Sequence, residues 1–272
     1  MNLSDKYDYL RKIGSGSFGE VWEIIDKETF VRYAAKEETE SSKKRSMLLK
    51  EKNIYCDLHE NNFGTGIPIV YWLVNTSKKN ILIMELLGEN LDMIFLKQKK
   101  IMSLSQIKDY GFQFIQLIYK LHKCGYIHRD IKPQNFIVGN KNKNEINICD
   151  FGLAKKYLDE KNIHIHFRDN KKPVGTARYS SIYVHNGIEP SRRDDLISII
   201  YVLIYFRNGS LPWQNLSKKN KRAIVKKKES VPIEKLCKNC PTLGKALSYC
   251  YSLEFSEEPD YGYVSEQILL MK

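Results

Sequence analysis

The stretch IHRDIKPQN at residues 127–135, followed by DFG at residues 150–152, constrains this chain more than any other feature. Either motif alone could arise by chance, but chance does not produce both in this order and at this spacing. Asn135 and Asp150 carry amide and carboxylate oxygens, which are the ligands that a hard cation such as Mg²⁺ prefers. Each of the two motifs therefore contains one oxygen donor of this kind.

A glycine-rich segment near the N-terminus predicts a phosphate-binding loop. Its three glycines let the backbone approach phosphates without a side-chain clash. The same spacing occurs in dinucleotide-binding folds, but there the loop opens a helix, whereas residues 21–25 are typical of a strand. The residues expected to bind nucleotide here are Ile13, Gly14, Ser15, Gly16, Ser17, Phe18, Gly19 and Val21.

Lys36 follows two alanines in the next strand-like run, where its ammonium group can reach the α- and β-phosphates of a nucleotide. Its partner should be a carboxylate on the following helix, and Glu51 lies in the amphipathic segment 42–58. A lysine that is paired with a carboxylate stays charged and points in one direction. The sequence therefore predicts a Lys36–Glu51 ion pair.

Together these motifs resemble the signature of protein kinases, and the resemblance covers nearly the whole chain. It implies ATP and Mg²⁺ as cofactors, with Asn135 and Asp150 as metal ligands. It also implies that Asp130 accepts or orients the proton of the substrate hydroxyl, while Lys132 neutralises charge on the transferred phosphoryl group. Lysine at position 132 is typical of serine/threonine kinases, because tyrosine kinases usually carry an arginine further along this loop.

The segment MELL at residues 84–87 resembles the kinase hinge, with Met84 as the gatekeeper. The backbone of Glu85 and Leu87 would then pair with adenine. The apolar side chains expected on the faces of the adenine ring are Ile13, Val21, Ala34 and Ile137.

Short β-compatible runs separated by turns occupy the first 87 residues, whereas helical periodicity dominates after Gly88, most clearly at 103–124 and 194–206. We predict an α+β, bilobal protein-kinase fold over residues 1–272. Its small β-rich N-lobe (1–87) would carry one main helix, and its C-lobe (88–272) would be larger and α-helical. The net charge of +12 lies entirely in the second part, which predicts an anionic partner there.

A narrower resemblance begins after the DFG motif. Where most kinases have Ala-Pro-Glu, this chain has GTARYSSI at 175–182 and GIEPSRRDDL at 187–196. These segments, with GSLPWQ at 209–214 and PDY at 259–261, are similar to the casein kinase 1 family. The resemblance implies that Asp195 braces the catalytic loop and that acidic or phosphate-primed serine/threonine sites are preferred. The chain departs from the family pattern at Tyr183, Ile200 and Ile224, where Asn, Gly and Lys are usual.

The segment from Leu153 to Gly175 contains no serine or threonine, so phosphorylation of this loop is not expected to be needed for activity. Arg129, which pairs with a loop phosphate in many kinases, would then need another anion. Basic residues gather nearby, and guanidinium groups can grip a phosphate. The residues expected to bind an anion of the substrate are Arg129, Lys155, Lys171 and Arg178.

Two other functions stay open. A pseudokinase scaffold would bind Mg-ATP and transfer no phosphate, although every phosphate-binding and metal-binding residue is present. The basic run at 218–228 could add a nucleic-acid-binding role, which a steep loss of DNA binding with salt would support. No aromatic residue is interleaved in this run, so we expect a solvated helix face or loop and no nucleic acid as partner.

Acidic or phosphorylated proteins are the expected partners, and a monomer is the expected state. The chain contains no run of about 18 apolar residues, so no membrane span is predicted. The N-terminus lacks the apolar centre of a signal peptide, which makes the cytoplasm or nucleus the default location. Cys237 and Cys240 form a lone C-x-x-C pair, for which reduced, structural thiols are expected.

Overall fold

A computed structural model describes residues 3–16, 19–39, 46–76, 79–217 and 220–272. The chain forms two compact units: Met1–Glu89 with Ile137–Gly152, and Asn90–Phe136 with Leu153–Lys272. The segment 137–152, which chain order alone assigns to the second part, thus belongs to the first unit.

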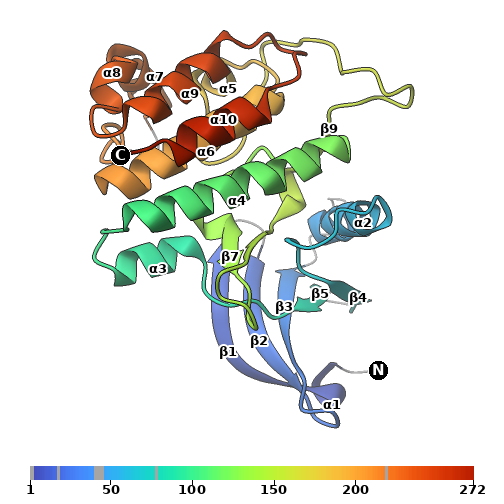
Figure 1. Ribbon diagram of the computed structural model, residues 1–272. Coiled ribbons are helices and arrows are strands. Elements are labelled where there is room, and N and C mark those ends of the chain that lie inside the picture. Colours follow the sequence, from blue (N-terminus) through green and yellow to red (C-terminus); the bar gives the residue numbers. More distant parts are fainter. Residues whose placement is uncertain (1–2, 17–18, 40–45, 77–78, 218–219) are drawn as a thin grey trace. The chain divides into compact units, whose positions relative to one another are not determined.

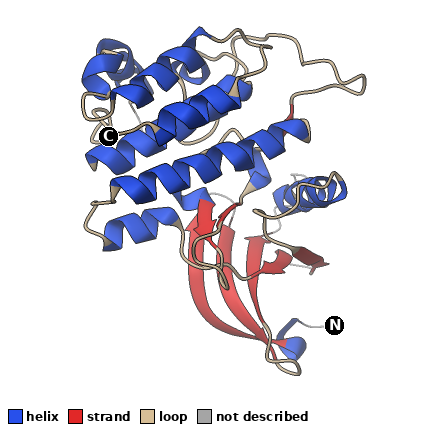
Figure 2. Cartoon of the chain, viewed as in Figure 1, coloured by secondary structure: helices blue, strands red, loops and turns tan. Residues whose placement is uncertain are grey.

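The first unit is built on a five-stranded antiparallel sheet, drawn in red in Figure 2. Its strands lie in the order β1-β2-β3-β5-β4. Their bounds are β1 (Tyr7–Gly16), β2 (Gly19–Asp26), β3 (Arg32–Thr39), β4 (Val70–Asn75) and β5 (Lys79–Glu85). Tyr7, Ile24, Ala35, Ile81 and Ile83 form a buried cluster on this sheet. The strand-like runs of the sequence are confirmed here as strands.

Two helices accompany the sheet, α1 (Leu3–Lys6) and α2 (Met47–Glu60), and α2 packs against β4 and β5. The Ser46 hydroxyl caps α2 by accepting a hydrogen bond from the Leu49 amide at 3.2 Å. Leu48, Ile54 and Leu58 are buried, which confirms an amphipathic helix in this segment. Residues 42–45 of the predicted helix lie outside the described residues. Short strands β7 (Phe136–Val138) and β8 (Ile146–Ile148) pair with each other.

The second unit is mainly helical. Its longest helices are α4 (Leu104–Lys123), α6 (Arg192–Asn208), α9 (Pro241–Ser252) and α7 (Lys221–Ser230). The shorter elements are α3 (Leu91–Lys97), β6 (Tyr126–Ile127), β9 (Lys155–Lys156), α5 (Ile182–His185), α8 (Ile233–Leu236), α10 (Tyr261–Leu269) and a 3-10 turn at Pro133–Asn135. A second 3-10 turn, Phe151–Leu153, begins in the first unit, which ends at Gly152. Helix α4 packs against α6 and α10, and α9 packs against the same two helices (Figure 1).

Helix α6 is buried along most of its length, which explains why its sequence is apolar on every side. It begins with two arginines that are also buried, and the Ser191 amide donates to the Asp194 carboxylate at 2.8 Å to cap it. Gly209 ends the helix with a φ of 75°, a conformation that suits glycine. Ser103 caps α4 through a capping box with Gln106. Within the described residues, no helix is both long and apolar enough to cross a membrane.

Candidate active site

The hairpin between β1 and β2 contains the predicted phosphate loop. Gly14 pairs with Val21, and Gly16 pairs with Gly19, where the strands meet. Gly19 has a φ of 130°, and a Cβ there would lie 1.7 Å from the carbonyl oxygen of Glu37 on β3. No residue with a side chain fits this position without moving β3. Ile13 and Ser15 lie on β1 near the hairpin, whereas Ser17 and Phe18 lie outside the described residues.

The predicted adenine-facing residues lie on adjacent strands. Ala34 on β3 pairs with Met84 on β5, and both side chains are buried. Val21 pairs with Lys36 across β2 and β3, so it lies two residue pairs from Ala34 and Met84 along the sheet. Ile137 on β7 is half-buried.

The predicted hinge follows β5. The Glu85 amide donates to the Ile69 carbonyl at 2.8 Å, so an adenine contact at this residue would have to use its carbonyl oxygen. Leu87 lies in the irregular segment beyond, and the next amide, that of Gly88, donates to the Val138 carbonyl at 2.9 Å. These bonds fix the backbone of the first unit on both sides of Leu87.

Lys36 forms the predicted ion pair with Glu51, with 2.7 Å between Nζ and Oε2, and a second one with Asp150, with 2.8 Å between Nζ and Oδ1. Burial by itself would lower the pKa of Lys36, but attraction by the two carboxylates outweighs it and raises the pKa above its usual value. The ammonium group therefore stays charged. One lysine thus ties α2 and the DFG segment to β3.

Sequence reasoning missed Tyr55, which holds the DFG segment in place. Its hydroxyl accepts a hydrogen bond from the Asp150 amide at 3.2 Å, and its ring meets that of Phe151 edge-on at 4.9 Å. Asp150 has a φ of 68°, an uncommon conformation for a residue with a side chain. Tyr55 lies one helical turn after Glu51 on α2, so the two side chains share a face of the helix. This spacing is the sequence feature from which the role of Tyr55 could have been predicted.

In the second unit, Asp195 braces the loop that contains the HRD motif, as the casein kinase 1 resemblance implies. Its carboxylate accepts hydrogen bonds from the amides of His128 and Arg129, at 2.7 and 2.9 Å, and contacts the His122 ring at 3.1 Å. Burial alone would raise the pKa of Asp195, but these contacts lower it below its usual value. The carboxylate stays ionised and holds Arg129 at a φ of 68°.

Two side chains grip the carboxylate of Asp130. Lys132 Nζ lies 2.5 Å from Oδ2, and the Thr176 hydroxyl donates to Oδ1 at 2.7 Å. The Asn135 amide nitrogen donates to the Asp130 carbonyl at 2.9 Å, which orients that side chain as well. Gly175 permits this arrangement, because a Cβ there would lie 2.3 Å from the Arg129 carbonyl oxygen.

The four residues expected to bind a substrate anion all belong to the second unit. Arg129 and Lys155 converge on the buried carboxylate of Glu189, at 3.8 and 2.9 Å, and Arg129 Nε also donates to the Leu153 carbonyl. Arg129 was expected to need another anion, and Glu189 of the same chain supplies one. That Arg129 also binds an anion of the substrate stays a prediction. Glu189 lies beyond the segment 153–175 in the sequence, so spacing alone did not pair it with Arg129.

Arg178 and Lys171 contact other groups of the second unit. The Arg178 guanidinium lies 5.8 Å from the ring centres of both Tyr179 and Tyr205. Lys171 is exposed, and its amide donates to the Gly187 carbonyl at 2.8 Å.

The basic run at 218–228 is a helix along much of its length, α7, but one of its residues is not solvated as expected. Lys221, Arg222, Lys226 and Lys227 are exposed, and residues 218 and 219 lie outside the described residues. Lys228 is only 4% exposed. It turns inward because its amino group donates to two backbone carbonyls, those of Ala177 and Ser180.

Two of the departures from the casein kinase 1 pattern have a packing explanation. The Tyr183 hydroxyl donates to the Tyr251 carbonyl at 2.8 Å, and the Arg193 guanidinium lies 3.8 Å from the Tyr183 ring centre. Ile224 is buried on α7. Both side chains therefore serve the interior of the second unit.

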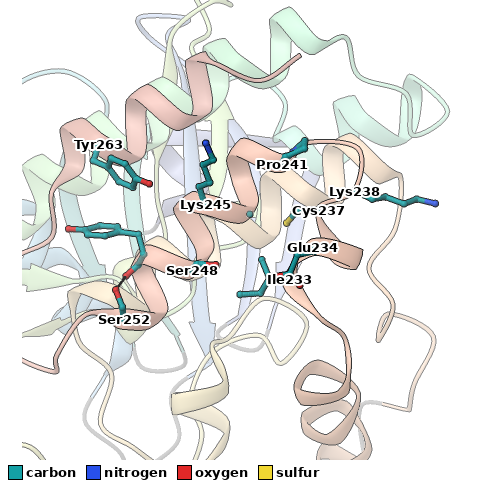
Figure 3. Close-up of a pocket in the computed structure, with 11 residues that line it drawn as sticks. Ile233, Glu234, Cys237, Lys238, Pro241, Lys245, Ser248, Ser252 and Tyr263 are labelled. Atoms are coloured by element: carbon teal, nitrogen blue, oxygen red, sulfur yellow. Dashed lines mark hydrogen bonds between the residues drawn. The ribbon is translucent and has the colours of Figure 1, made fainter.

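The second unit also contains a cavity of about 810 Å³, which α8, α9 and Tyr263 line (Figure 3). None of the residues predicted to bind nucleotide, metal or substrate lines it. Cys237 is among the residues that line this cavity.

A comparison with known protein families identifies the family that has these motifs and this fold. The family model for the protein kinase domain matches residues 7–256, which is most of the chain. The β-sheet unit and the helical unit are those of the α+β, bilobal kinase fold, so the predicted fold class is confirmed. Members of this family transfer phosphate from ATP with a divalent metal ion. The chain belongs to the protein kinase family.

Proposed function

We propose that this chain is a serine/threonine kinase of the casein kinase 1 type, which phosphorylates acidic or phosphate-primed sites in proteins with Mg-ATP. The observation that carries the proposal is the grip of Lys132 and Thr176 on the two carboxylate oxygens of Asp130. Lysine at position 132 and threonine after Gly175 are the serine/threonine pattern, and both side chains here touch the residue assigned to the acceptor hydroxyl.

The geometry suits transfer of a phosphoryl group to a hydroxyl. Asp130 would accept the proton of the serine or threonine as its oxygen attacks the γ-phosphorus, and the bond from that phosphorus to ADP would break. Lys132 would neutralise charge on the group in transfer. Lys36, kept charged by Glu51, would hold the α- and β-phosphates.

The donor set suits magnesium. The Asp150 carboxylate and the Asn135 amide oxygen are hard ligands, and a protein contact orients each of them, through Lys36 and through the Asp130 carbonyl. A bound Mg²⁺ would offset the negative charge of the phosphates. The apolar residues Ala34, Met84 and Val21, with Ile13 and Ile137, would contact adenine.

The preference for acidic or primed substrates rests on charge. The excess of basic residues lies after residue 87. Glu189 offsets only one of the two positive charges of Arg129 and Lys155, so we assign the anion contact to these two residues together with Lys171 and Arg178. Glu189 supplies Arg129 with a carboxylate from the chain itself, which supports activity without phosphorylation of the segment 153–175.

The test is an assay of the purified chain with Mg-ATP on casein and on matched primed and unprimed serine peptides. We expect phosphoserine in the products and faster turnover of the primed peptide. Asp130→Asn should abolish transfer and leave Mg-ATP affinity nearly unchanged, because Asp130 acts on the acceptor hydroxyl. Mg-ATP binding without transfer by the unaltered chain would show a pseudokinase instead, and full activity of Asp130→Asn would refute the roles given above.

A further inference from the structure

Lys228 is set apart from the other lysines of α7 by its burial. Its neighbours Lys226 and Lys227 are exposed, whereas Lys228 is 4% exposed. Removing an amino group from water costs free energy unless other groups solvate it. What surrounds Lys228 therefore indicates its role.

Polar and aromatic groups of the same unit replace the lost water. The amino group donates to the Ala177 carbonyl at 3.0 Å and to the Ser180 carbonyl at 2.5 Å. It also lies 5.0 Å from the ring centre of Tyr201 and 5.1 Å from that of Trp213, within the range of cation–π contacts. Burial lowers the pKa of Lys228, yet a neutral amine would still donate both hydrogen bonds.

The two carbonyls belong to a short segment, residues 177–180, which other donors also hold. Trp213 Nε1 donates to the Arg178 carbonyl at 2.8 Å, and the His185 ring contacts the Ala177 carbonyl at 3.1 Å. Lys228 differs from them because it joins both ends of the segment through one atom.

The segment begins directly after Thr176, the residue whose hydroxyl donates to Asp130. The Thr176 carbonyl in turn accepts hydrogen bonds from the amides of Tyr179 and Ser180, at 2.9 and 3.1 Å. The turn that Lys228 closes thus fixes the backbone of Thr176. If the turn loosens, Thr176 loses its fixed position against Asp130.

We propose that Lys228 is a positioning residue for phosphate transfer, which holds the turn at residues 177–180 so that Thr176 stays hydrogen-bonded to Asp130, the residue assigned to the acceptor hydroxyl. The inference rests on the proposed kinase function. It predicts that loss of the amino group impairs the use of the peptide and spares nucleotide binding, because the nucleotide residues Lys36, Glu51 and Asp150 belong to the other unit.

The experiment compares Lys228→Met with Lys227→Met, its exposed neighbour on α7. Peptide kcat and KM are measured at saturating Mg-ATP, together with the Kd for Mg-ATP and the melting temperature. We expect kcat/KM for the peptide to fall about tenfold or more in Lys228→Met, with the nucleotide Kd within about twofold of the unaltered chain. Lys227→Met should match the unaltered chain, and Lys228→Arg, which keeps a donor, should recover part of the loss.

Equal kcat/KM in Lys228→Met and Lys227→Met would overturn the inference, and so would a loss in which nucleotide affinity falls in parallel. If Lys228→Met does not fold, Trp213→Phe decides, since it removes another donor to the same turn and keeps a ring beneath Lys228. A selective loss of peptide turnover in Trp213→Phe supports the positioning role, and unaltered kinetics refute it. An unaltered chain that transfers no phosphate would instead refute the proposed function itself, and the inference with it.

Discussion

Lys36 and Lys228 are both buried lysines, but different kinds of group surround their amino groups in the two units of the molecule. Two carboxylates surround Lys36 and raise its pKa, whereas backbone carbonyls and aromatic rings surround Lys228, and burial lowers its pKa. The carboxylates around Lys36 outnumber it and leave a negative balance, which favours a further cation nearby. The amino group of Lys228 instead donates its hydrogen bonds to two backbone carbonyls, those of Ala177 and Ser180. The partners of a buried lysine, more than its burial, indicate whether it handles a ligand or fixes a loop.

The largest effect should come from Lys36→Met, which leaves Glu51 and Asp150 without the lysine between them. We expect kcat for phosphate transfer to fall about 100- to 1,000-fold, because a charge that stabilises the phosphates is lost. Lys228→Met should cost far less and should act on the peptide. Steady-state kinetics of both variants in ATP and in peptide measure the contrast. If the two variants changed the kinetic constants for ATP and for the peptide in the same way, both lysines would serve the same step.

An intermediate effect should come from Arg178, which lies on aromatic rings as Lys228 does but is less buried. Arg178→Glu should cost about 1–3 kcal/mol of the preference for a primed over an unprimed peptide, as expected for the loss of a charge-assisted contact. Lys172→Glu, at an exposed position of the same segment, is the matched control and should change the preference less. Equal losses on both peptides would assign Arg178 to the fold and place it in the same class as Lys228.

The smallest effect concerns His185, which shares the Ala177 carbonyl with Lys228. Burial first, and then the charge of Lys228, lower the pKa of His185 to about 4. The folded chain therefore favours the neutral ring, so this contribution to stability is present above the usual histidine pKa and is lost as the pH falls through about 4. In Lys228→Met the pKa of His185 should rise toward its usual value, which an NMR titration of the ring would detect. An unchanged pKa would mean that Lys228 carries no charge in the folded chain.

The sequence was sufficient for the parts of the site that depend on spacing within one element or motif. The Lys36–Glu51 pair follows from a strand and a helix whose patterns are both clear, and Asp195 follows from a family segment. The roles of Tyr55, Glu189 and Lys228 were harder to predict, because each residue contacts a backbone group or a side chain that is distant along the sequence. Lys228 in particular is one of several lysines with equal sequence character, and only the course of residues 177–180 distinguishes it. The contact of Glu189 with Arg129 was missed for the same reason, and the substrate-anion site stays a prediction.

The contact between Gly175 and the Arg129 carbonyl leaves no room for even one methyl group. An alanine at 175 would therefore separate Thr176 from Asp130 by a purely steric route, without removing a charge, a metal ligand or a nucleotide contact. Such a chain should still bind the nucleotide, whose residues Lys36, Glu51 and Asp150 belong to the other unit, and should lose turnover because Thr176 no longer orients Asp130. It would separate nucleotide binding from the transfer step with no change in the charge of the chain.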